Sequence, residues 1–554
     1  MLAALTSMLM PLILLLAGLW LAAMNGGYVW GVAVMGLALL IFIKKIIEFL
    51  SLSLHTAHQI NLLHESRKLS KAYGHARLAS TQDGFIKALI KNRSGFYVGS
   101  MAGEPLFYDP YQSGNGHMLT YAPSRTGKTI SVIIPALLHW FGGSMFVTDV
   151  KGELTAITAK YRKSRGQNVL IFNPFNVLGI KGVNFNPLRI LVDDVMKNAG
   201  KDLHDLARSI AFQLIAERPN DMGDGVFFRN GGRRLIITFL LYMAVFMPDN
   251  CTLPTLRKLI WSGSGKQKAI AFEMRSSDWL HGLLRDYGNG LAEMLRSEYI
   301  KTYGAFRDNA MNALEIYDAH SPMGAAMSSS DFKLSDMLDG KTTLYVILPE
   351  AKLETHGSAL GLIATLLLET IAAAPAPAPV MMLLEEMGNI GKLPNLSKAL
   401  SLLPGKGVRL WMVFQSRRQP IEIYGQQMAG LIEEQSSFMQ AWSIRGELDR
   451  KAWSARTGNK TMKARSLTRD PNNPVSPWRL SINERAASVI SVDEIGRMDM
   501  SHQLIAIDGK AVIRAEKLAY FQIEPWRKLA GKSPYHKNNY PKNLPVRIYL
   551  NGHA

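Results

Sequence analysis

The sequence predicts an α/β fold in which helices cover a parallel sheet, with an all-helical insertion and an apolar helical hairpin in front. Three observations lead to this prediction. Short apolar runs alternate with helical patterns, which is typical of parallel sheets wrapped by helices. The strand pattern disappears between Asn173 and Thr343, where apolar residues recur at helical spacing. The stretch from Met1 to Ile43 contains no charged side chain.

Seven apolar runs have the length and composition of buried strands. They are His117–Tyr121, Met145–Val150, Val169–Asn173, Thr343–Leu348, Val380–Leu384, Leu410–Gln415 and Gln503–Asp508. The amphipathic stretches that interrupt them are Asp202–Glu217, Arg229–Phe246, Gly290–Tyr303 and Phe306–Asp318. We therefore expect residues 190–335 to form an all-α insertion within the α/β domain.

The apolar amino-terminal stretch is long enough for two membrane spans, since one spanning helix needs roughly 20 apolar residues. We place the spans at about 5–24 and 28–43, with Asn25-Gly26-Gly27 as the turn. A cleaved signal peptide is the alternative, but no basic segment precedes the stretch and a second apolar run follows at once. Lys44 and Lys45 close the stretch, so the positive-inside rule places the rest of the chain in the cytoplasm.

Composition limits the classes of protein further. The 554 residues are 47% hydrophobic and 19% charged, which excludes disorder as the main state. Cys251 is the only cysteine, so a disulfide framework and a cysteine-based metal site are excluded. Lys and Arg number 63 against 44 Asp and Glu, giving a net charge of +19. This balance indicates an acidic partner, either nucleic acid or anionic lipid.

The strongest motif is the run His117–Thr129, in which an expected strand leads through a loop into an apolar helix start. This is the context of a phosphate-binding P-loop, whose pattern is Gly-x₄-Gly-Lys-Ser/Thr. The expected loop residues are Ala122, Pro123, Ser124, Arg125, Thr126, Gly127, Lys128 and Thr129. Backbone N–H groups would cradle the phosphates, Lys128 would reach the β and γ oxygens, and Thr129 would ligate Mg²⁺. Ala122 replaces the first glycine, which is tolerable if its φ stays negative.

A P-loop needs carboxylates at the end of another strand, and the run Val380–Leu384 is followed directly by Glu385 and Glu386. One acid should hold the Mg²⁺ and the other should activate the attacking water as a general base. Side chains alternate along a strand, so the two acids cannot do the same job unless the strand has already ended. We assign Glu385 to the metal and Glu386 to the water. Gln415, at the end of a third strand, is placed to sense the γ-phosphate. Asp149 follows the second strand on the same edge and is a further candidate.

Several blocks together resemble the type IV secretion coupling ATPases of the TraG/TraD kind. The blocks are Tyr121–Thr129, Val147–Glu153, Tyr161-Arg162, Phe172–Pro174, Asn186–Leu188, Thr343–Pro349, Leu384–Gly391, Arg409–Ser416 and Ser491–Glu494. Their order and spacing make the resemblance specific, and it runs through nearly the whole chain. It implies a RecA-like P-loop domain with an inserted all-α domain, two amino-terminal spans and a ring of six subunits.

The same resemblance implies a function. The protein would be a bacterial inner-membrane ATPase that couples a relaxase–DNA substrate to the subunits of a type IV secretion channel. It would use ATP and Mg²⁺ to drive DNA transfer in conjugation. Two alternatives remain: the same ATPase recruiting protein effectors, or a membrane receptor that docks cargo without hydrolysis. Intact Lys128, Thr129 and Glu386 argue against the last one.

Two departures from the family pattern concern the active site. Glu385 stands where the family usually has Asp. An arginine finger often precedes the Gln-bearing strand, and here either Lys406 or Arg409 would have to serve.

The expected segments of the chain follow from these motifs. They are a transmembrane hairpin (1–46), a cytoplasmic connector (47–110), the first part of the nucleotide-binding domain (111–189), the insertion (190–335), the second part of the nucleotide-binding domain (336–524) and a basic tail (525–554). The densest basic stretch contains Lys451, Arg456, Lys460, Lys463, Arg465 and Arg469, with Trp453 among them. Such a stretch could line a DNA channel, and it could equally be a solvated basic face.

Overall fold

The computed structural model describes residues 9–24, 28–65, 72–112, 116–216, 223–390, 392–393, 395–468, 479–535 and 544–550. The chain forms two compact units. The larger one comprises residues 78–457 and 490–554, and the smaller one residues 1–77 and 458–489. Each unit is described by itself.

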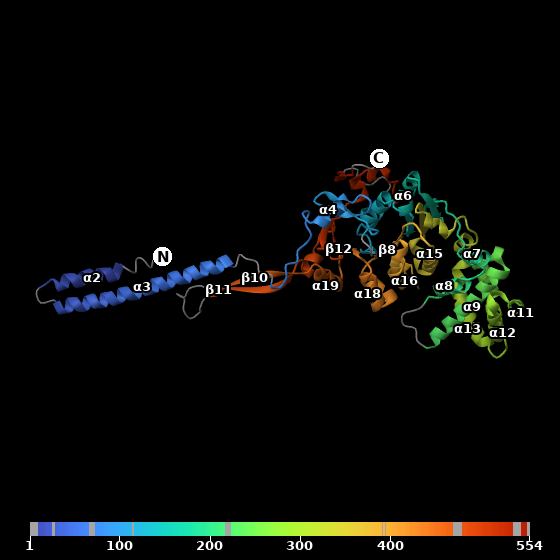
Figure 1. The fold of residues 1–554 in the computed structure, drawn as a ribbon, viewed down its shortest axis with the longest axis horizontal. Helices are drawn as coiled ribbons and strands as arrows, with labels where there is room; N and C mark the ends of the chain where they lie inside the picture. Colours follow the sequence, from blue (N-terminus) through green and yellow to red (C-terminus); the bar gives the residue numbers. More distant parts are fainter. Residues whose placement is uncertain are drawn as a thin grey trace. The chain divides into compact units, whose positions relative to one another are not determined.

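An eleven-stranded sheet forms the centre of the larger unit (Figure 1), in the order β2-β1-β13-β12-β9-β3-β8-β7-β4-β6-β5. The seven strands predicted from the sequence are confirmed. They are β3 (Met118–Tyr121), β4 (Ser144–Asp149), β5 (Asn168–Phe172), β6 (Thr342–Ile347), β7 (Val380–Leu384), β8 (Val408–Phe414) and β12 (His502–Ile507). The strands from β9 to β5 run parallel, so their carboxyl ends meet at one edge. Their buried apolar side chains are what strands covered on both faces require.

Four further strands extend this sheet. They are β1 (Phe96–Met101), β2 (Glu104–Tyr108), β9 (Phe438–Ala441) and β13 (Ile513–Glu516). β9 lies parallel to β3, whereas β12, β13, β1 and β2 form an antiparallel extension beyond it. The expected connector 47–110 therefore contributes two strands to the sheet, because the side chains of Phe96–Val98 and Leu106–Tyr108 are buried in the same core.

The carboxy-terminal tail also packs on this core in its described parts. β14 (Ile523–Glu524) pairs in parallel with β15 (Ile548–Tyr549), and α21 (Trp526–Leu529) buries Trp526 against Tyr97. The backbone N–H of Gly531 donates to the carbonyl of Ile157 at 2.7 Å. The tail predicted from 525 onward is thus part of the fold, since one buried tryptophan and these backbone bonds hold it in place.

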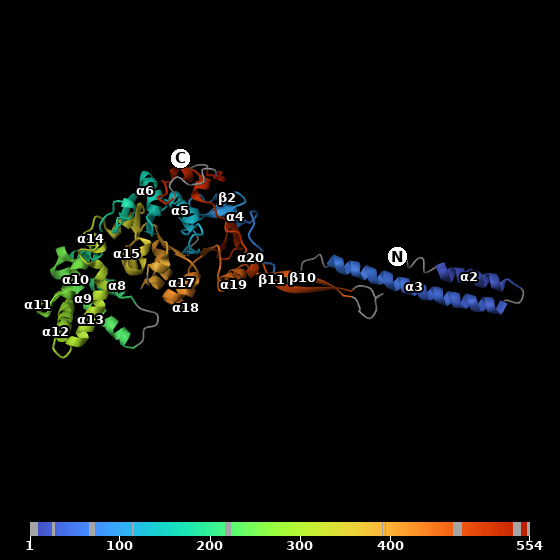
Figure 2. The ribbon, with the colours of Figure 1, turned by 180° about the vertical axis from the view of Figure 1, so that it is seen from behind.

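Between β5 and β6 the described residues are helical. The helices are α7 (Arg189–Asn198), α8 (Leu203–Leu214), α9 (Asp224–Phe246), α10 (Leu253–Trp261), α11 (Ser264–Arg275), α12 (Leu283–Met294), α13 (Ile300–Leu314) and α14 (Pro322–Ala326). Helices α9 to α13 gather at one end of the larger unit in both views (Figures 1 and 2). The stretch Gly290–Tyr303, predicted as one helix, is broken after Met294, because α12 packs on α11 whereas α13 packs on α9.

The remaining helices of the larger unit connect or cover the strands. They are α4 (Gly84–Lys91), α5 (Ile134–His139), α6 (Glu153–Ser164), α15 (Leu353–Ala373), α16 (Leu396–Ser401), α17 (Arg418–Tyr424), α18 (Gln426–Glu434), α19 (Glu447–Arg456) and α20 (Val492–Gly496). In the described part of the chain, Glu350–Ala373 is the one helix that is long and apolar enough to cross a membrane. Most of it is buried inside the larger unit, as expected for a core helix.

The smaller unit begins with a pair of packed helices, α2 (Leu9–Ala22) and α3 (Tyr28–Glu65). A Cβ on Gly31 would lie 2.6 Å from the backbone nitrogen of Ala22, so only glycine permits this approach. The second predicted span was expected to end at Ile43, but α3 continues to Glu65. At 1.5 Å per residue its 38 residues extend about 57 Å, which exceeds the roughly 30 Å of a bilayer core.

The smaller unit also contains a two-stranded antiparallel ribbon, β10 (Asn459–Thr468) and β11 (Arg479–Ser488). The segment before the sheet of the larger unit joins this ribbon, since Thr461 N donates to Gly74 O at 3.0 Å and Ala76 N donates to Asn459 O at 3.1 Å. The predicted basic stretch is therefore divided. Lys451 and Arg456 belong to α19 in the larger unit, whereas Lys460 belongs to the ribbon. Arg469 lies outside the described residues.

Arg162 on α6 has a buried guanidinium that ties three elements together. Its Nη1 donates to the carbonyls of Leu137 at 2.7 Å and Trp140 at 2.9 Å, and its Nε donates to Thr343 Oγ1 at 2.9 Å. These bonds join α6 to the end of α5 and to strand β6. Burial lowers the pKa of this guanidinium to about 10, which leaves it charged at neutral pH.

We expect Arg162→Ala to destabilise the larger unit by about 3–5 kcal/mol, because it opens a cavity and leaves several buried acceptors unpaired. Thermal unfolding of the purified chain measures the effect, with Lys163→Ala at the neighbouring exposed position as the control. Equal melting temperatures for the two variants would contradict the structural role of Arg162.

Candidate nucleotide-binding site

The P-loop lies between β3 and a π-helical turn, η1 (Thr129–Ile133), which continues into α5. Arg125 and Gly127 have left-handed backbone angles, with φ of 62° and 86°. Such angles on either side of Thr126 curl the backbone into a concave loop, and the Thr126 hydroxyl closes it by donating to Pro123 O at 2.7 Å. Ala122 keeps a negative φ, which meets the condition for replacing the first glycine.

Three predicted site residues meet at the carboxyl edge of the sheet. The ammonium of Lys128 forms an ion pair with Glu386, and both side chains are largely buried. Gln415, directly after β8, donates through Nε2 to the other oxygen of Glu386 at 3.0 Å. The strand order explains this meeting, because β8 lies between β3, which leads into the P-loop, and β7, which leads into Glu386.

Thr129 and Glu385 form a second pair in the same place, with Thr129 Oγ1 donating to Glu385 Oε1 at 3.0 Å. Burial raises the pKa of Glu385 to about 8, Lys128 lowers it, and the neighbouring carboxylates of Asp149 and Glu386 raise it. A cation beside Glu385 would therefore favour its ionised form. A hydroxyl and a carboxylate are the oxygen ligands that Mg²⁺ prefers, and this ion usually keeps several waters. The donor set fits Mg²⁺.

The backbone separates the two adjacent glutamates. β7 ends at Leu384, and Glu386 has a left-handed φ of 54°. This turn directs Glu385 to Thr129 and Glu386 to Lys128. The division of partners matches the roles that we predicted from side-chain alternation, although the strand has already ended where the two side chains diverge.

Asp149 lies beside this group, but its oxygens are engaged elsewhere. Oδ2 accepts from Thr155 N and from Thr155 Oγ1, both at 2.8 Å, and Oδ1 accepts from Lys151 N at 3.3 Å. Burial raises the pKa of Asp149, and these bonds lower it. In this structure Asp149 therefore fixes the start of α6, and its electrostatic effect on Glu385 is its link to the predicted site.

The structure shows the surroundings of Arg409 and Lys406, the two candidates for an arginine finger. The guanidinium of Arg409 is buried, donates to the carbonyls of Pro404 at 2.8 Å and Pro110 at 3.2 Å, and lies over the ring of Tyr111. Such a side chain cannot reach a neighbouring subunit, so Arg409 is a structural residue. Lys406 is half-buried, and its ammonium donates to Ala374 O at 2.7 Å.

Sequence reasoning missed two groups that support the P-loop and its neighbours. Trp442, after β9, donates from Nε1 to Thr126 Oγ1 at 2.9 Å, and Lys517, after β13, donates to Thr126 O at 3.1 Å. Glu433 on α18 accepts from Tyr121, Arg417 and Arg456 and so joins β3, the start of α17 and α19. No local pattern marks these residues, because each partner lies on a different element.

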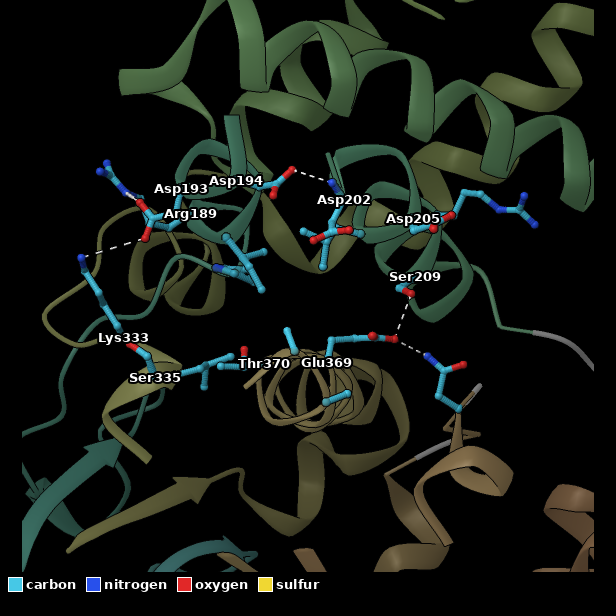
Figure 3. Close-up of a pocket in the computed structure, with 18 of the residues that line it drawn as sticks. Arg189, Asp193, Asp194, Asp202, Asp205, Ser209, Lys333, Ser335, Glu369 and Thr370 are labelled. Carbon is cyan, nitrogen blue, oxygen red and sulfur yellow. Dashed lines mark hydrogen bonds and ion pairs between the residues drawn. The ribbon is translucent and has the colours of Figure 1, made fainter. Parts of the chain in front are cut away.

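A large cleft in the described part of the chain lies elsewhere. It has a volume of about 1050 Å³ and lies between α7, α8 and α15 (Figure 3). Several of its charged groups have partners within the cleft. Asp193 contacts Arg189, Lys197 and Lys333, and Glu369 accepts from Ser209 at 3.2 Å and Asn395 at 2.6 Å. The cleft is a polar interface between the insertion and α15, and no P-loop residue lines it.

The fold and the site together define a P-loop nucleotide-binding domain with an all-α insertion between its motifs. A family model described as "Type IV secretory system Conjugative DNA transfer" matches residues 68–543. The chain belongs to this family of conjugative DNA transfer proteins.

Curated relatives carry related names. The conjugal transfer protein TraG of Escherichia coli is 26% identical over 344 residues, which cover 59% of this chain and 52% of TraG. Protein VirD4 of Rhizobium radiobacter is 24% identical over 480 residues, which cover 84% of this chain and 66% of VirD4. The chain thus spans about half the length of the Escherichia coli relative that it matches.

Solved structures show the same fold. The bacterial conjugative coupling protein TrwBΔN70 in its unbound form has a TM-score of 0.59 at 13% identity, covering 80% of this chain and 92% of that one. TrwB in complex with ADP and Mg²⁺ gives a TM-score of 0.58 at 13% identity, covering 80% and 94%. This likeness confirms the predicted fold class, a RecA-like α/β domain with an inserted all-α domain.

The two glutamates should respond differently to removal of their charge. We expect Glu386→Gln to keep ATP binding but to lower hydrolysis about 10²–10⁴-fold, because it removes the general base. Glu385→Gln should instead raise the Mg²⁺ concentration needed for half-maximal activity. Phosphate release and nucleotide titrations at several Mg²⁺ concentrations measure both effects. The assignment is reversed if Glu386→Gln hydrolyses ATP at the parent rate while Glu385→Gln is inactive.

Proposed function

We propose that this protein is a ring-forming ATPase of the inner bacterial membrane that couples a DNA substrate to a type IV secretion channel and drives its transfer in conjugation. The observation that carries the proposal is the hydrogen-bonded group of Lys128, Thr129, Glu385, Glu386 and Gln415, in a chain of the conjugative DNA transfer family. TrwB, which shares the fold, has been crystallised with ADP and Mg²⁺ and with a non-hydrolysable ATP analogue.

In this proposal ATP is the substrate and the P-loop binds its phosphates. Backbone N–H groups of residues 122–129 cradle the phosphate oxygens at the start of η1. Thr129 and Glu385 would hold Mg²⁺, which neutralises charge on the phosphates. Glu386 orients and deprotonates the attacking water, and Gln415 holds the carboxylate of Glu386 in the required direction.

The ion pair between Lys128 and Glu386 supports a role for the nucleotide in arranging the site. Each group neutralises the other in a place with little solvent. Because a phosphate chain carries more negative charge than one carboxylate, Lys128 should move to the β and γ oxygens when ATP binds. Glu386 then loses the contact with Lys128, keeps the hydrogen bond from Gln415 and becomes available as a base. The site would thus be activated by its own substrate.

The helices of the smaller unit support a membrane anchor. Large apolar side chains of both helices are exposed, among them Leu16, Trp20, Trp30 and Leu40, and such a surface needs a lipid environment. Trp20 lies near the end of α2 and Trp30 near the start of α3, whereas Lys44 and Lys45 follow the second predicted span. The turn predicted at Asn25-Gly26-Gly27 lies outside the described residues. Tryptophans favour membrane interfaces and cytoplasmic flanks carry the lysines, so the helix ends with Trp20 and Trp30 would face the periplasm and the bulk of the chain the cytoplasm.

Several partners follow from this function. Six copies would form a ring, in which each nucleotide site is completed by a neighbour. Single-stranded DNA would be held without sequence preference by cationic side chains of the ring, in agreement with a net charge of +19. A relaxase would deliver the DNA, and subunits of the secretion channel would receive it.

Removal of the P-loop ammonium tests the motor directly. We expect Lys128→Ala to fold but to lose ATP turnover and DNA transfer between cells, because the charge that pairs with the phosphates is gone. Mating assays with the complemented variant measure transfer, and Lys163→Ala serves as the control for a lost surface lysine. Transfer at the parent level by Lys128→Ala would contradict a motor driven by ATP.

The charge of the chain leads to a prediction about the cargo. DNA affinity should depend little on sequence and should fall steeply between about 50 and 200 mM salt, because phosphate contacts release counterions. Fluorescence anisotropy with two unrelated single-stranded oligonucleotides measures both properties. An affinity that does not respond to salt would show that the positive charge serves lipid or protein instead.

A further inference from the structure

One backbone carbonyl of the P-loop accepts hydrogen bonds from two side chains that come from different strands. The oxygen of Thr126 lies 3.1 Å from Lys517 Nζ and 3.2 Å from Trp442 Nε1. All three residues are buried, with exposed fractions of 5% for Thr126, 8% for Lys517 and 0% for Trp442. Trp442 follows β9, which pairs with β3, whereas Lys517 follows β13, which β12 and β9 separate from β3.

This arrangement fixes the direction of an N–H group. In a trans peptide the C=O and the following N–H point in opposite directions. With the carbonyl of Thr126 held by Lys517 and Trp442, the N–H of Gly127 points the opposite way within the peptide plane. Gly127 has a φ of 86° and lacks a side chain, so its peptide has more freedom to rotate than most. The two donors remove this freedom before any phosphate arrives.

Lys517 is itself held in a fixed position. Its backbone N–H donates to Ser501 O at 2.7 Å, and its ammonium lies 4.7 Å from the centre of the Trp442 ring, a cation–π distance. The charged group that acts on it is Asp499, in the turn before β12, whereas Thr126 and Trp442 are uncharged. Burial lowers the pKa of Lys517 to about 8, and Asp499 partly opposes this.

We propose that Lys517 is a positioning residue for the phosphate chain of the bound nucleotide: its ammonium holds the Thr126–Gly127 peptide so that the Gly127 N–H faces the phosphates. The proposal rests on nucleotide binding at the P-loop and adds a residue that the P-loop motif does not contain. The affinity for a nucleoside di- or triphosphate, or for pyrophosphate alone, would increase equally, because the peptide N–H contacts the phosphates and not the base.

The proposal makes the affinity for nucleotide depend on pH in one direction. Bound phosphates favour the charged form of Lys517, so its pKa is higher in the complex than in the free protein. Affinity is therefore full below about pH 8 and falls as the pH rises from 8 toward the value in the complex. Burial also raises the pKa of Glu385 to about 8. Both variants compared below retain Glu385, so its contribution to the pH response is the same in each.

The test compares Lys517→Met with Lys510→Met, which removes an exposed lysine from the same β12–β13 hairpin. Calorimetric titration of the detergent-solubilised full chain with ADP is run from pH 7 to 9.5 at constant ionic strength. We expect Lys517→Met to bind ADP about 10–100-fold more weakly at pH 7, because a charge-assisted hydrogen bond is lost. Its decline between pH 8 and 9.5 should be smaller than that of Lys510→Met, and saturating ATP should restore most of the turnover.

A second pair of variants covers the case in which Lys517→Met does not fold. Trp442→Phe removes the N–H donor but keeps the ring, and should weaken ADP binding while keeping the full pH response. Lys517→Arg keeps a cation at this position. At high pH it should therefore bind ADP more tightly than Trp442→Phe does. Equal affinity and equal pH response of Lys517→Met and Lys510→Met would overturn the inference. Absence of ADP binding by the unaltered chain would overturn the proposed nucleotide site itself.

Discussion

The ion pair between Lys128 and Glu386 joins parts of the chain that are 258 residues apart in sequence. The all-α insertion lies between them, so the pair can form only if the sheet brings the end of β3 close to the end of β7. The order β3-β8-β7 does this, and it places Gln415 at the end of the strand between them. The geometry of the predicted site therefore depends on parallel pairing across the insertion.

Burying carboxylates at this edge of the sheet costs desolvation free energy. Neighbouring residues of the site offset this cost by ion pairing and hydrogen bonding. Glu385, Glu386 and Asp149 are three carboxylates close enough to affect one another, and Lys128 is the cation that lowers the pKa of Glu385. Thr155 and Lys151 satisfy Asp149 by hydrogen bonds, and Lys128 satisfies Glu386. This leaves Glu385, whose pKa is raised to about 8, as the carboxylate with most to gain from a divalent cation. The electrostatics of these carboxylates thus agree with the oxygen ligands proposed for Mg²⁺.

The sequence was sufficient to predict the seven main strands, the helical insertion and the P-loop, because each has a local pattern. It was not sufficient for β9 or β13, which have four residues each and little periodicity. Trp442 and Lys517 could not be assigned to the P-loop, since their role arises only when the sheet places the ends of β9 and β13 near that loop. The interpretation of Arg409 as a possible finger was wrong for a related reason. An arginine before a strand gives no sign of whether it faces solvent or the carbonyls of Pro110 and Pro404.

The central claim is that Lys128 exchanges Glu386 for phosphate when nucleotide binds. A structure of the full chain with a non-hydrolysable ATP analogue and Mg²⁺ tests it most directly. The account predicts the analogue's phosphates in the loop of residues 122–129, Lys128 in contact with the β and γ oxygens, and Glu386 separated from Lys128. An analogue bound in that loop with the Lys128–Glu386 pair intact, or bound elsewhere in the protein, would contradict it.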